Sequence, residues 1–250
     1  MAKVISIINQ KGGVGKSTTA EAVLAGLTLK GYKTLAIDLD AQGNLTYSAG
    51  AKSGGASSLG VLTGEVEASQ AIQKTKSGDI IPASKALAGA DAFITDTGKE
   101  YKLKEAIEGL QMEYDYIVID TPPALSILTI NALTASNSVI IPAQADIYSL
   151  QGIEQLAETI APVKKYCNKD LLIEGILLTR YNKRSILSQD IAELAKQIAS
   201  KLDTKVFDST IREAIAIKEA QISRISLFEY APHAKVTEDY KAFINELIGA

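Results

Sequence analysis

The sequence reads Lys11-Gly12-Gly13-Val14-Gly15-Lys16-Ser17-Thr18 just after an apolar run at residues 4–8 and at the start of an amphipathic stretch at residues 17–30. This order predicts a strand, a glycine-rich turn and the beginning of a helix. Glycines let backbone amides approach a polyphosphate, and a helix N-terminus adds N–H groups and a favourable dipole. We therefore expect a phosphate-binding loop in which Lys16 supplies positive charge and the Ser17 hydroxyl ligates Mg²⁺.

The rest of the chain alternates short apolar runs with amphipathic stretches. The runs are rich in β-branched residues and predict buried strands at residues 34–37, 117–119, 138–141 and 171–178, with helices at 101–112, 150–166, 186–201 and 236–248. Continuous rather than alternating hydrophobicity favours strands that helices cover on both faces. We predict one α/β domain, residues 1–250, with a doubly wound, mostly parallel sheet of the P-loop NTPase type.

Composition and charge exclude several other classes of protein. The formal net charge is -3, so any site for a polyanion must be a local patch. The single cysteine, Cys167, excludes an intrachain disulfide, and the single histidine, His233, cannot build a histidine zinc site and is expected in a turn before the last helix. With no signal-peptide pattern and no long apolar run, we expect a soluble, cytoplasmic protein. The glycine- and serine-rich stretch 49–64 suggests a mobile connection, with an ordinary surface loop as the favoured alternative.

Three carboxylates follow predicted strands at the end where a parallel sheet binds its ligands. Asp38 and Asp40 follow the second strand, and residues two apart in an extended chain point the same way, so both can face one Mg²⁺ and water site. Asp120 ends the third strand, where a Walker B element carries its magnesium partner. The alternatives are a turn-forming role for the first two and a helix N-cap for Asp120. We predict Ser17, Asp38 and Asp120 on the metal side.

The loop departs from the common phosphate-loop pattern G-x-x-x-x-G-K-[ST]. It has Gln10 where that pattern has glycine, and Lys11 stands beside the glycines. In this form it resembles the signature of the ParA/MinD family of deviant Walker ATPases, and most of all the small partition ATPases of ParA/Soj type. The likeness extends over residues 3–247 and is strong at residues 210–220.

The resemblance implies a homodimer with ATP sandwiched at its interface. In the family the extra lysine, here Lys11, reaches the nucleotide of the other subunit, and the second aspartate, here Asp40, orients the attacking water. Ala41 stands where the family pattern has proline. We expect Lys11, Lys16 and Asp40 to be catalytic, with slow hydrolysis unless a partner and DNA stimulate it.

The resemblance also suggests where the base lies. In relatives the chain near Ile211 and Arg212 borders the adenine. The sequence has no Asn-Lys-x-Asp element of the kind that reads guanine, and the choice of ATP follows mainly from the resemblance. We expect the loop residues 11–18 together with Ile211 and Arg212 to bind the cofactor.

Relatives of this kind hold DNA nonspecifically in the ATP state and release it when a ParB-like centromere- or cargo-binding partner accelerates hydrolysis. A basic patch would be needed, and candidate cations are Arg180, Lys183, Arg184, Arg224 and Lys235, with Arg212 and Lys218 as contributors. Ordinary solvated charge is the alternative for this set. The expected location is the nucleoid in the cytoplasm, and no residue identifies the cargo.

Two other functions stay open. A MinD-like ATPase would need a basic amphipathic helix for the membrane surface, but the last predicted helix contains Glu238, Asp239 and Glu246, so we expect no membrane-targeting extension. A biosynthetic enzyme of dethiobiotin-synthetase type is less favoured, and iron–sulfur relatives need two cysteines per subunit. Because the chain begins at its first strand, we expect no N-terminal helix-turn-helix domain.

Overall fold

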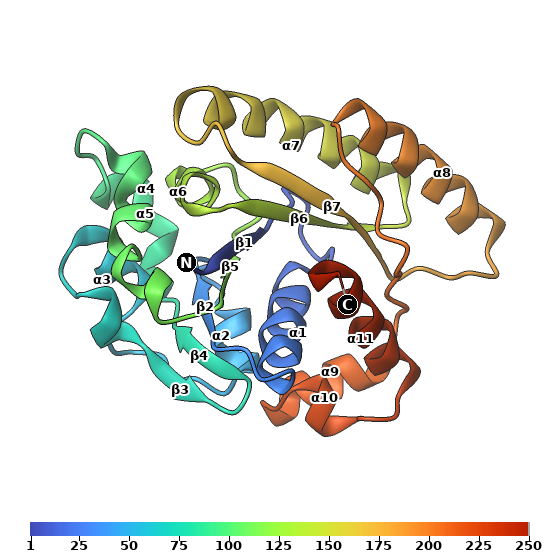
Figure 1. Ribbon diagram of the computed structural model, residues 1–250, viewed down its shortest axis with the longest axis horizontal. Coiled ribbons are helices and arrows are strands. Elements are labelled where there is room, and N and C mark those ends of the chain that lie inside the picture. Colours follow the sequence, from blue (N-terminus) through green and yellow to red (C-terminus); the bar gives the residue numbers. More distant parts are fainter. Residues whose placement is uncertain (250) are drawn as a thin grey trace.

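The computed structural model describes residues 1–249, which form a seven-stranded sheet in the order β3-β4-β2-β5-β1-β6-β7 (Figure 1). Every neighbouring pair is parallel except β3 and β4, which form an antiparallel hairpin at one edge. The strands are β1 Lys3–Ile7, β2 Thr34–Asp38, β3 Gln73–Thr75, β4 Gly78–Ile81, β5 Tyr116–Asp120, β6 Ser138–Gln144 and β7 Leu172–Thr179.

Helices cover both faces of the sheet, as the unbroken apolar strands require. One face carries α1, α2 and α9 to α11, and the other carries α3 to α8. The helices are α1 Lys16–Leu29, α2 Asn44–Ser48, α3 Ser58–Thr63, α4 Ala90–Phe93, α5 Lys102–Ala106, α6 Ile127–Ala135, α7 Ile147–Tyr166, α8 Ile186–Lys201, α9 Ile215–Ser223, α10 Leu227–Tyr230 and α11 Lys235–Ile248.

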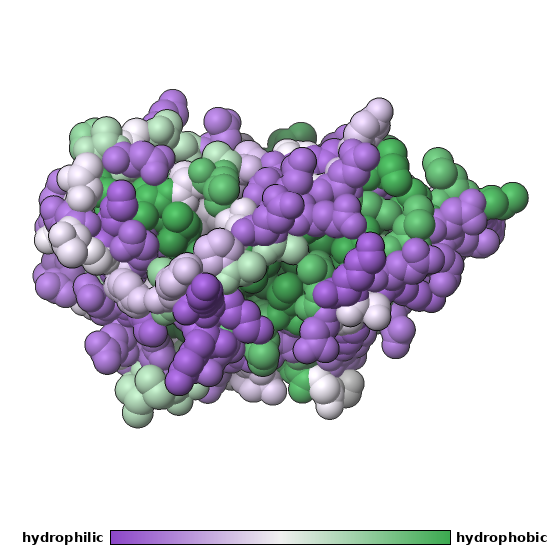
Figure 2. Space-filling view, turned by 90° about the horizontal axis from the view of Figure 1, so that it is seen from above, coloured by the Kyte–Doolittle hydropathy of each residue, from purple (hydrophilic) through white to green (hydrophobic). Residues whose placement is uncertain are grey.

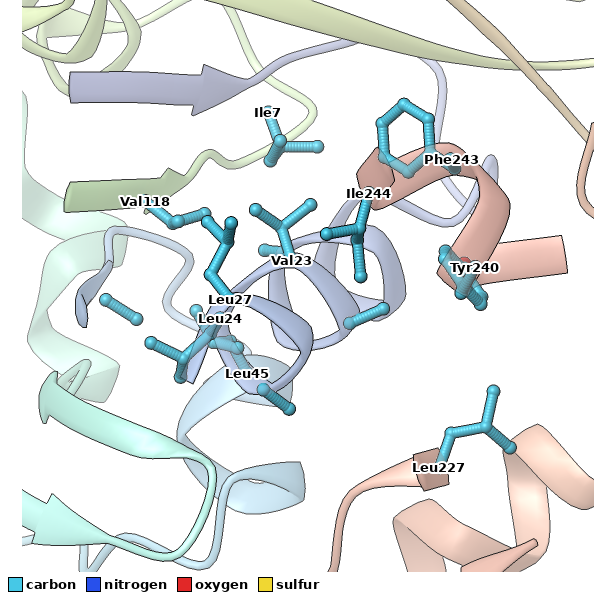
Figure 3. Packing of buried hydrophobic residues seen from close by; sticks show 14 of the residues in the cluster. Ile7, Val23, Leu24, Leu27, Leu45, Val118, Leu227, Tyr240, Phe243 and Ile244 are labelled. Atoms are coloured by element: carbon cyan, nitrogen blue, oxygen red, sulfur yellow. The ribbon is translucent and has the colours of Figure 1, made fainter. Parts of the chain in front are cut away.

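The core around α1 fixes the end of the molecule that carries the glycine-rich loop. Ile7 of β1 and Val118 of β5 point toward Val23 and Leu27 of α1, and α11 contributes Ile244 on the other side of that helix (Figure 3). All five side chains are buried. Helix α1 is therefore clamped between the sheet and α11, so its N-terminus has a defined position at the carboxyl ends of the strands.

The register of the central strands brings the predicted carboxylates together. Asp38 at the end of β2 pairs with Asp120 at the end of β5, and Ile7 at the end of β1 is the neighbour of Asp120 on the other side. The loop that follows β1 therefore begins beside both aspartates. The predicted convergence at the carboxyl edge of the sheet is confirmed.

The predicted fold class and all five predicted strands are confirmed, but three details of the sequence interpretation are wrong. The predicted helix 101–112 is only the short α5, followed by a single 3₁₀ turn at Gly109–Met112. The β3–β4 hairpin and α6 were not predicted; α6 is almost wholly buried, so it lacks a polar face and its helical period is hidden. The stretch 49–64 contains α3, whose Val61 and Leu62 lie in the core.

The two isolated reactive residues lie where the sequence suggested. Cys167 is a half-buried free thiol at the end of α7. His233 is exposed in a turn just before α11. Among residues 1–249 no helix is both long and apolar enough to cross a membrane.

Candidate functional site

A cleft of about 620 Å³ opens at the carboxyl ends of the strands and is lined by loop residues Gly12 to Thr18. Its volume lies within the usual range of ligand sites. Gly13 and Gly15 have φ values of 77° and 92°, which only glycine adopts without strain. Gly15 is the N-cap of α1 and has no side chain to satisfy the first N–H groups of the helix. These donors point at the cleft, as an anion site requires.

Two neighbouring strands hold the loop in this shape. Gln144 at the end of β6 donates from Nε2 to the Gly13 carbonyl at 2.7 Å. Thr179 at the end of β7 donates from Oγ1 to the Val14 carbonyl at 2.8 Å. Each bond uses a loop carbonyl and leaves the N–H groups for a ligand. Sequence reasoning did not assign either side chain this role, since nothing in the local pattern reveals it.

Lys16 is the buried cation of the cleft. Only 7% of the residue is exposed, and its Nζ donates to the Lys11 carbonyl at 3.2 Å. Burial lowers the pKa of Lys16, and the nearby Asp120 and Asp40 partly offset that effect. A polyphosphate would add opposite charge at this point and restore a strong preference for the protonated lysine.

Asp120 lies in an unfavourable environment for a carboxylate. It is fully buried, and within residues 1–249 neither of its side-chain oxygens has a hydrogen-bond partner. Burial raises the pKa of Asp120 well above its usual range, and the neighbouring Asp38 adds to this, while Ser17 and Lys16 act in the opposite direction. A buried, unsatisfied carboxylate is costly unless a ligand compensates it.

These groups fit a magnesium ion that arrives with its nucleotide. The described residues contain no group of three or more His, Cys, Asp or Glu side chains able to hold a metal by themselves. Mg²⁺ prefers few protein ligands and completes its octahedron with water and phosphate oxygens. Ser17 would supply the hydroxyl ligand and Asp120 would accept hydrogen bonds from the metal-bound water.

Asp38 and Asp40 lie beside this position but make different contacts. Asp38 accepts hydrogen bonds from the Asp40 N–H and from Thr46, so its carboxylate also shapes the loop that follows β2. Burial raises the pKa of Asp38 to about 6 despite these bonds. Asp40 lines the cleft, with its Oδ1 accepting from the Gln42 N–H.

Lys11 points away from the cleft of its own chain. Its Nζ lies 2.8 Å from both carboxylate oxygens of Asp146 and 3.1 Å from Ser149 Oγ, at the start of α7. Burial raises the pKa of Asp146, but bonds from Lys11 and Ser149 outweigh it and the pKa is lowered. Asp146 was not predicted, although aspartate is a preferred N-cap residue and its side chain here accepts the Ser149 N–H at the start of α7.

Comparison with known proteins identifies the chain. A family model described as an AAA domain matches residues 2–173. The sporulation initiation inhibitor protein Soj of Bacillus subtilis (strain 168) is 38% identical over 252 residues, covering 99% of this chain and 98% of that protein. The chain belongs to the ParA/MinD family of P-loop ATPases.

Solved structures of the ParA/MinD fold agree with this assignment. Cobyrinic acid a,c-diamide synthase from Mycobacterium smegmatis, with bound ATP analogue and magnesium, has a TM-score of 0.86 at 34% identity, covering 99% of this chain and 95% of that one. The septum site-determining protein MinD from Pyrococcus horikoshii OT3, complexed with Mg-ADP, has a TM-score of 0.79 at 25% identity, covering 99% and 96%. The predicted P-loop fold is confirmed.

The side of this ParA/MinD-family cleft where adenine is predicted is formed by the end of β7 and by the segment after α8. Thr179 of β7 lines it together with Ile211 and Arg212 of that segment. The Arg212 guanidinium makes two bonds of 2.6 and 2.7 Å to Asp239 of α11. That side chain is therefore anchored on α11, and the contact of Arg212 with adenine stays a prediction.

The candidate DNA-binding residues of this ParA/MinD-family chain do not all lie together. Arg180, Lys183 and Arg184 are exposed on the single loop between β7 and α8. Arg224 instead donates to the Tyr47 and Ala51 carbonyls at 3.3 and 2.7 Å, which ties the end of α9 to α2. Lys235 is exposed at the start of α11, on a separate element.

The loop between β7 and α8 leads into α8, whose first two residues are apolar and exposed. Figure 2 shows hydrophobic side chains at the surface toward the right-hand end of the molecule, where Figure 1 places this loop. The exposed apolar residues of the segment are Ile186 and Leu187, at 76% and 65%.

Proposed function

We propose that this chain is a partition ATPase that binds ATP with Mg²⁺ in the cleft and dimerises around it. The observation that carries the proposal is the placement of Lys11, beside the phosphate loop but bound to Asp146 outside the cleft. In this arrangement Lys11 contributes no charge to the nucleotide of its own chain. A second copy placed against this face would receive it, as in the ParA/Soj-type pattern that the loop resembles.

The described residues supply a sufficient set for slow phosphoryl transfer to water. Loop N–H groups and Lys16 would hold the phosphates, and Asp40 would orient the attacking water. Ser17 would ligate Mg²⁺, and Asp120 would accept hydrogen bonds from water bound to it. Mg²⁺, when bound, neutralises charge that develops on the transferred phosphoryl group. Lys11 of a second copy would add a further positive charge beside the transferred phosphoryl group. Hydrolysis is therefore slow in a monomer and faster once dimer, DNA and partner are present.

Two substitutions test the assignment of roles. Lys16→Ala removes the buried cation and is expected to abolish ATP binding in a calorimetric titration. Asp40→Ala keeps the phosphate loop intact, and we expect an ATP-bound dimer in gel filtration whose phosphate release falls to a small residual rate. Wild-type turnover in Asp40→Ala would refute the catalytic assignment, and ATP binding by Lys16→Ala would refute the cleft as the nucleotide site.

The DNA-binding state is proposed to use the loop between β7 and α8 in the ATP-bound dimer. Reversing charge in Lys183→Glu and Arg184→Glu should abolish ATP-dependent binding of duplex DNA and leave ATP hydrolysis without DNA unchanged. In the wild type, binding should weaken steeply with salt because neutralised phosphates release counterions. The matched control reverses Lys164 and Lys165, which are exposed at the end of α7. Equal losses in both variants would show a nonspecific charge effect instead.

Partner and cargo follow from relatives rather than from residues of this chain. Besides the protein named Soj, a chromosome partitioning protein ParA from Myxococcus xanthus (strain DK1622) is 34% identical and spans 99% of this chain. We infer a ParB-like partner that stimulates hydrolysis and releases the dimer from the nucleoid in the cytoplasm. The cargo is a plasmid, a chromosome or a protein assembly.

A second candidate is a biosynthetic P-loop enzyme, which the likeness to the protein named cobyrinic acid a,c-diamide synthase favours. The cleft continues past the phosphate loop to Tyr47, Gln221 and Ile222, which leaves room for a further ligand. Stimulation of ATP hydrolysis separates the two functions. DNA should raise the hydrolysis rate of a partition ATPase, whereas a biosynthetic enzyme should hydrolyse ATP only when its own substrate is added. Sedimentation with liposomes and ATP tests the MinD-like membrane function in the same preparation.

A further inference from the structure

We propose that Thr46 is a positioning residue for ATP hydrolysis, because it holds the loop that carries Asp40. The inference rests on the proposed function, in which Asp40 orients the attacking water. Thr46 belongs to the short helix α2 and does not line the cleft. It therefore acts through other residues rather than on the nucleotide.

The loop after β2 is fastened at both ends to one carboxylate. Asp38 Oδ1 accepts the Asp40 N–H at 3.1 Å. Asp38 Oδ2 accepts two bonds from Thr46, one from the backbone N–H at 2.8 Å and one from Oγ1 at 2.7 Å. The same side chain thus fixes where the loop leaves the strand and where it enters α2.

The Thr46 hydroxyl has two partners, and this limits which residue types can replace it. Its proton is donated to Asp38, and its lone pair accepts the Ala83 N–H at 2.9 Å, from the segment just after β4. A hydroxyl both donates and accepts, which an apolar side chain of the same shape cannot do. Valine at this position would leave the Ala83 N–H without its partner and remove one bond from Asp38.

Burial gives these bonds their strength and makes the loop stiff. Asp38 is fully buried and Thr46 nearly so, and polar bonds are stronger in such a low-dielectric setting than at the surface. Ser58 of α3 adds a further tie by donating to the Asp38 carbonyl at 2.6 Å. Between the fastened ends Asp40 is the carboxylate that reaches the cleft. Its position relative to the nucleotide therefore depends on the bonds that Thr46 makes.

The experiment compares Thr46→Val with Thr46→Ser in the full chain. Thr46→Val should lower kcat for ATP hydrolysis between about 10-fold and 100-fold, since a small misplacement of a reacting group has effects of this size. Its Kd for MgATP should match the wild type, because the phosphate loop is untouched. Thr46→Ser keeps the hydroxyl and should restore kcat. Thr237→Val is the matched control: Thr237 is a fully buried threonine of α11 whose hydroxyl donates to the Ala231 carbonyl.

A double variant separates positioning from simple loss of stability. If Thr46 acts through Asp40, adding Thr46→Val to Asp40→Ala should cause no further fall in the residual rate. Wild-type kcat in Thr46→Val, a weakened Kd for MgATP, failure of serine to rescue, or an equal fall in Thr237→Val would each overturn the inference. Wild-type kcat in Asp40→Ala would instead overturn the proposed function on which it rests, so the two failures are distinct.

Discussion

Buried carboxyl groups at the residue scale show how the surroundings decide the role of a side chain. Asp120 shares its pocket with Asp38, Lys16 and Ser17, so a cation and a polyphosphate complete its environment. Glu21 on α1 is almost as deeply buried, but its hydrogen bond comes from the neutral Ser77 hydroxyl at 3.3 Å. Burial raises the pKa of Glu21 to about 8, and the Ser77 bond lowers it only slightly.

Glu21 therefore predicts a pH dependence of stability. The native protein keeps the Glu21 proton up to a pKa of about 8, whereas the unfolded chain loses it near the ordinary pKa of 4.5. The native state binds more protons between these values, so stability is fully present below pH 4.5 and is lost as pH rises through 8. The glutamine side chain in Glu21→Gln is uncharged at every pH. The Tm of this variant should therefore fall less between pH 6 and 9 than the Tm of the wild type does. Parallel pH profiles for the two proteins would contradict the assignment of Glu21.

At the element scale the β3–β4 hairpin depends on one glycine. Gly78 begins β4 with φ at 132°, in a region that side chains rarely adopt. A Cβ there would lie 2.6 Å from Thr34 Oγ1 and 2.7 Å from a methyl group of Leu24. The turn therefore approaches β2 and α1 as closely as it does only because no side chain stands at this position.

Gly78→Ala should destabilise the fold by about 2 to 4 kcal/mol, combining backbone strain with overpacking. Urea unfolding measures the effect as a lower midpoint with an unchanged slope. The control is Gly109→Ala, because a Cβ at Gly109 would meet nothing within 4 Å and the residue has no positive φ. A midpoint shift in Gly78→Ala no larger than that of the control would show that the hairpin adapts.

At the scale of the whole molecule the ion pair between Lys11 and Asp146 links the phosphate loop to the start of α7. About a third of each side chain is exposed, so the pair contributes up to about 1 kcal/mol. If Lys11 must leave Asp146 to reach the nucleotide of a second copy, the pair opposes dimerisation. The monomer is then favoured until ATP and a partner subunit offer Lys11 a stronger interaction.

Asp146→Asn should release Lys11 and favour the ATP-bound dimer. Asparagine can still accept the Ser149 N–H that caps α7 but has no charge for the lysine. The dimerisation constant measured by analytical ultracentrifugation with ATP should tighten by up to about 30-fold, because each dimer breaks two such pairs of about 1 kcal/mol each. Glu174→Gln makes the same charge change in the pair with Lys3, outside the cleft lining, and should leave dimerisation unchanged. A weaker dimer in Asp146→Asn would refute the idea that the pair between Lys11 and Asp146 opposes dimerisation.

Predictions from the sequence succeeded where residues close together in the chain decide the local structure. The apolar run at residues 117–119, for example, lies in the buried strand β5, because an unbroken apolar strand is stable only where helices cover both of its faces. The pattern failed at α6, where Thr129 and Asn131 are buried with the apolar residues and leave no polar face. It also failed at residues 49–64, where glycines suggested a loop. Gly60 of that stretch belongs to α3 and packs closely against Val66, which follows the helix.

The sequence by itself determined the phosphate loop, the parallel core and the three aspartates at its edge. Each of these follows from residues close together in the chain: glycines at a turn, unbroken apolar strands, and the polar residue that ends a strand. Only the tertiary structure decided that Lys11 binds Asp146, that Thr46 fastens Asp38 to the segment after β4, and that Arg212 is anchored on Asp239. Lys11 and Asp146 are 135 positions apart, and local patterns carry no information about which distant groups the packed sheet brings within hydrogen-bond distance.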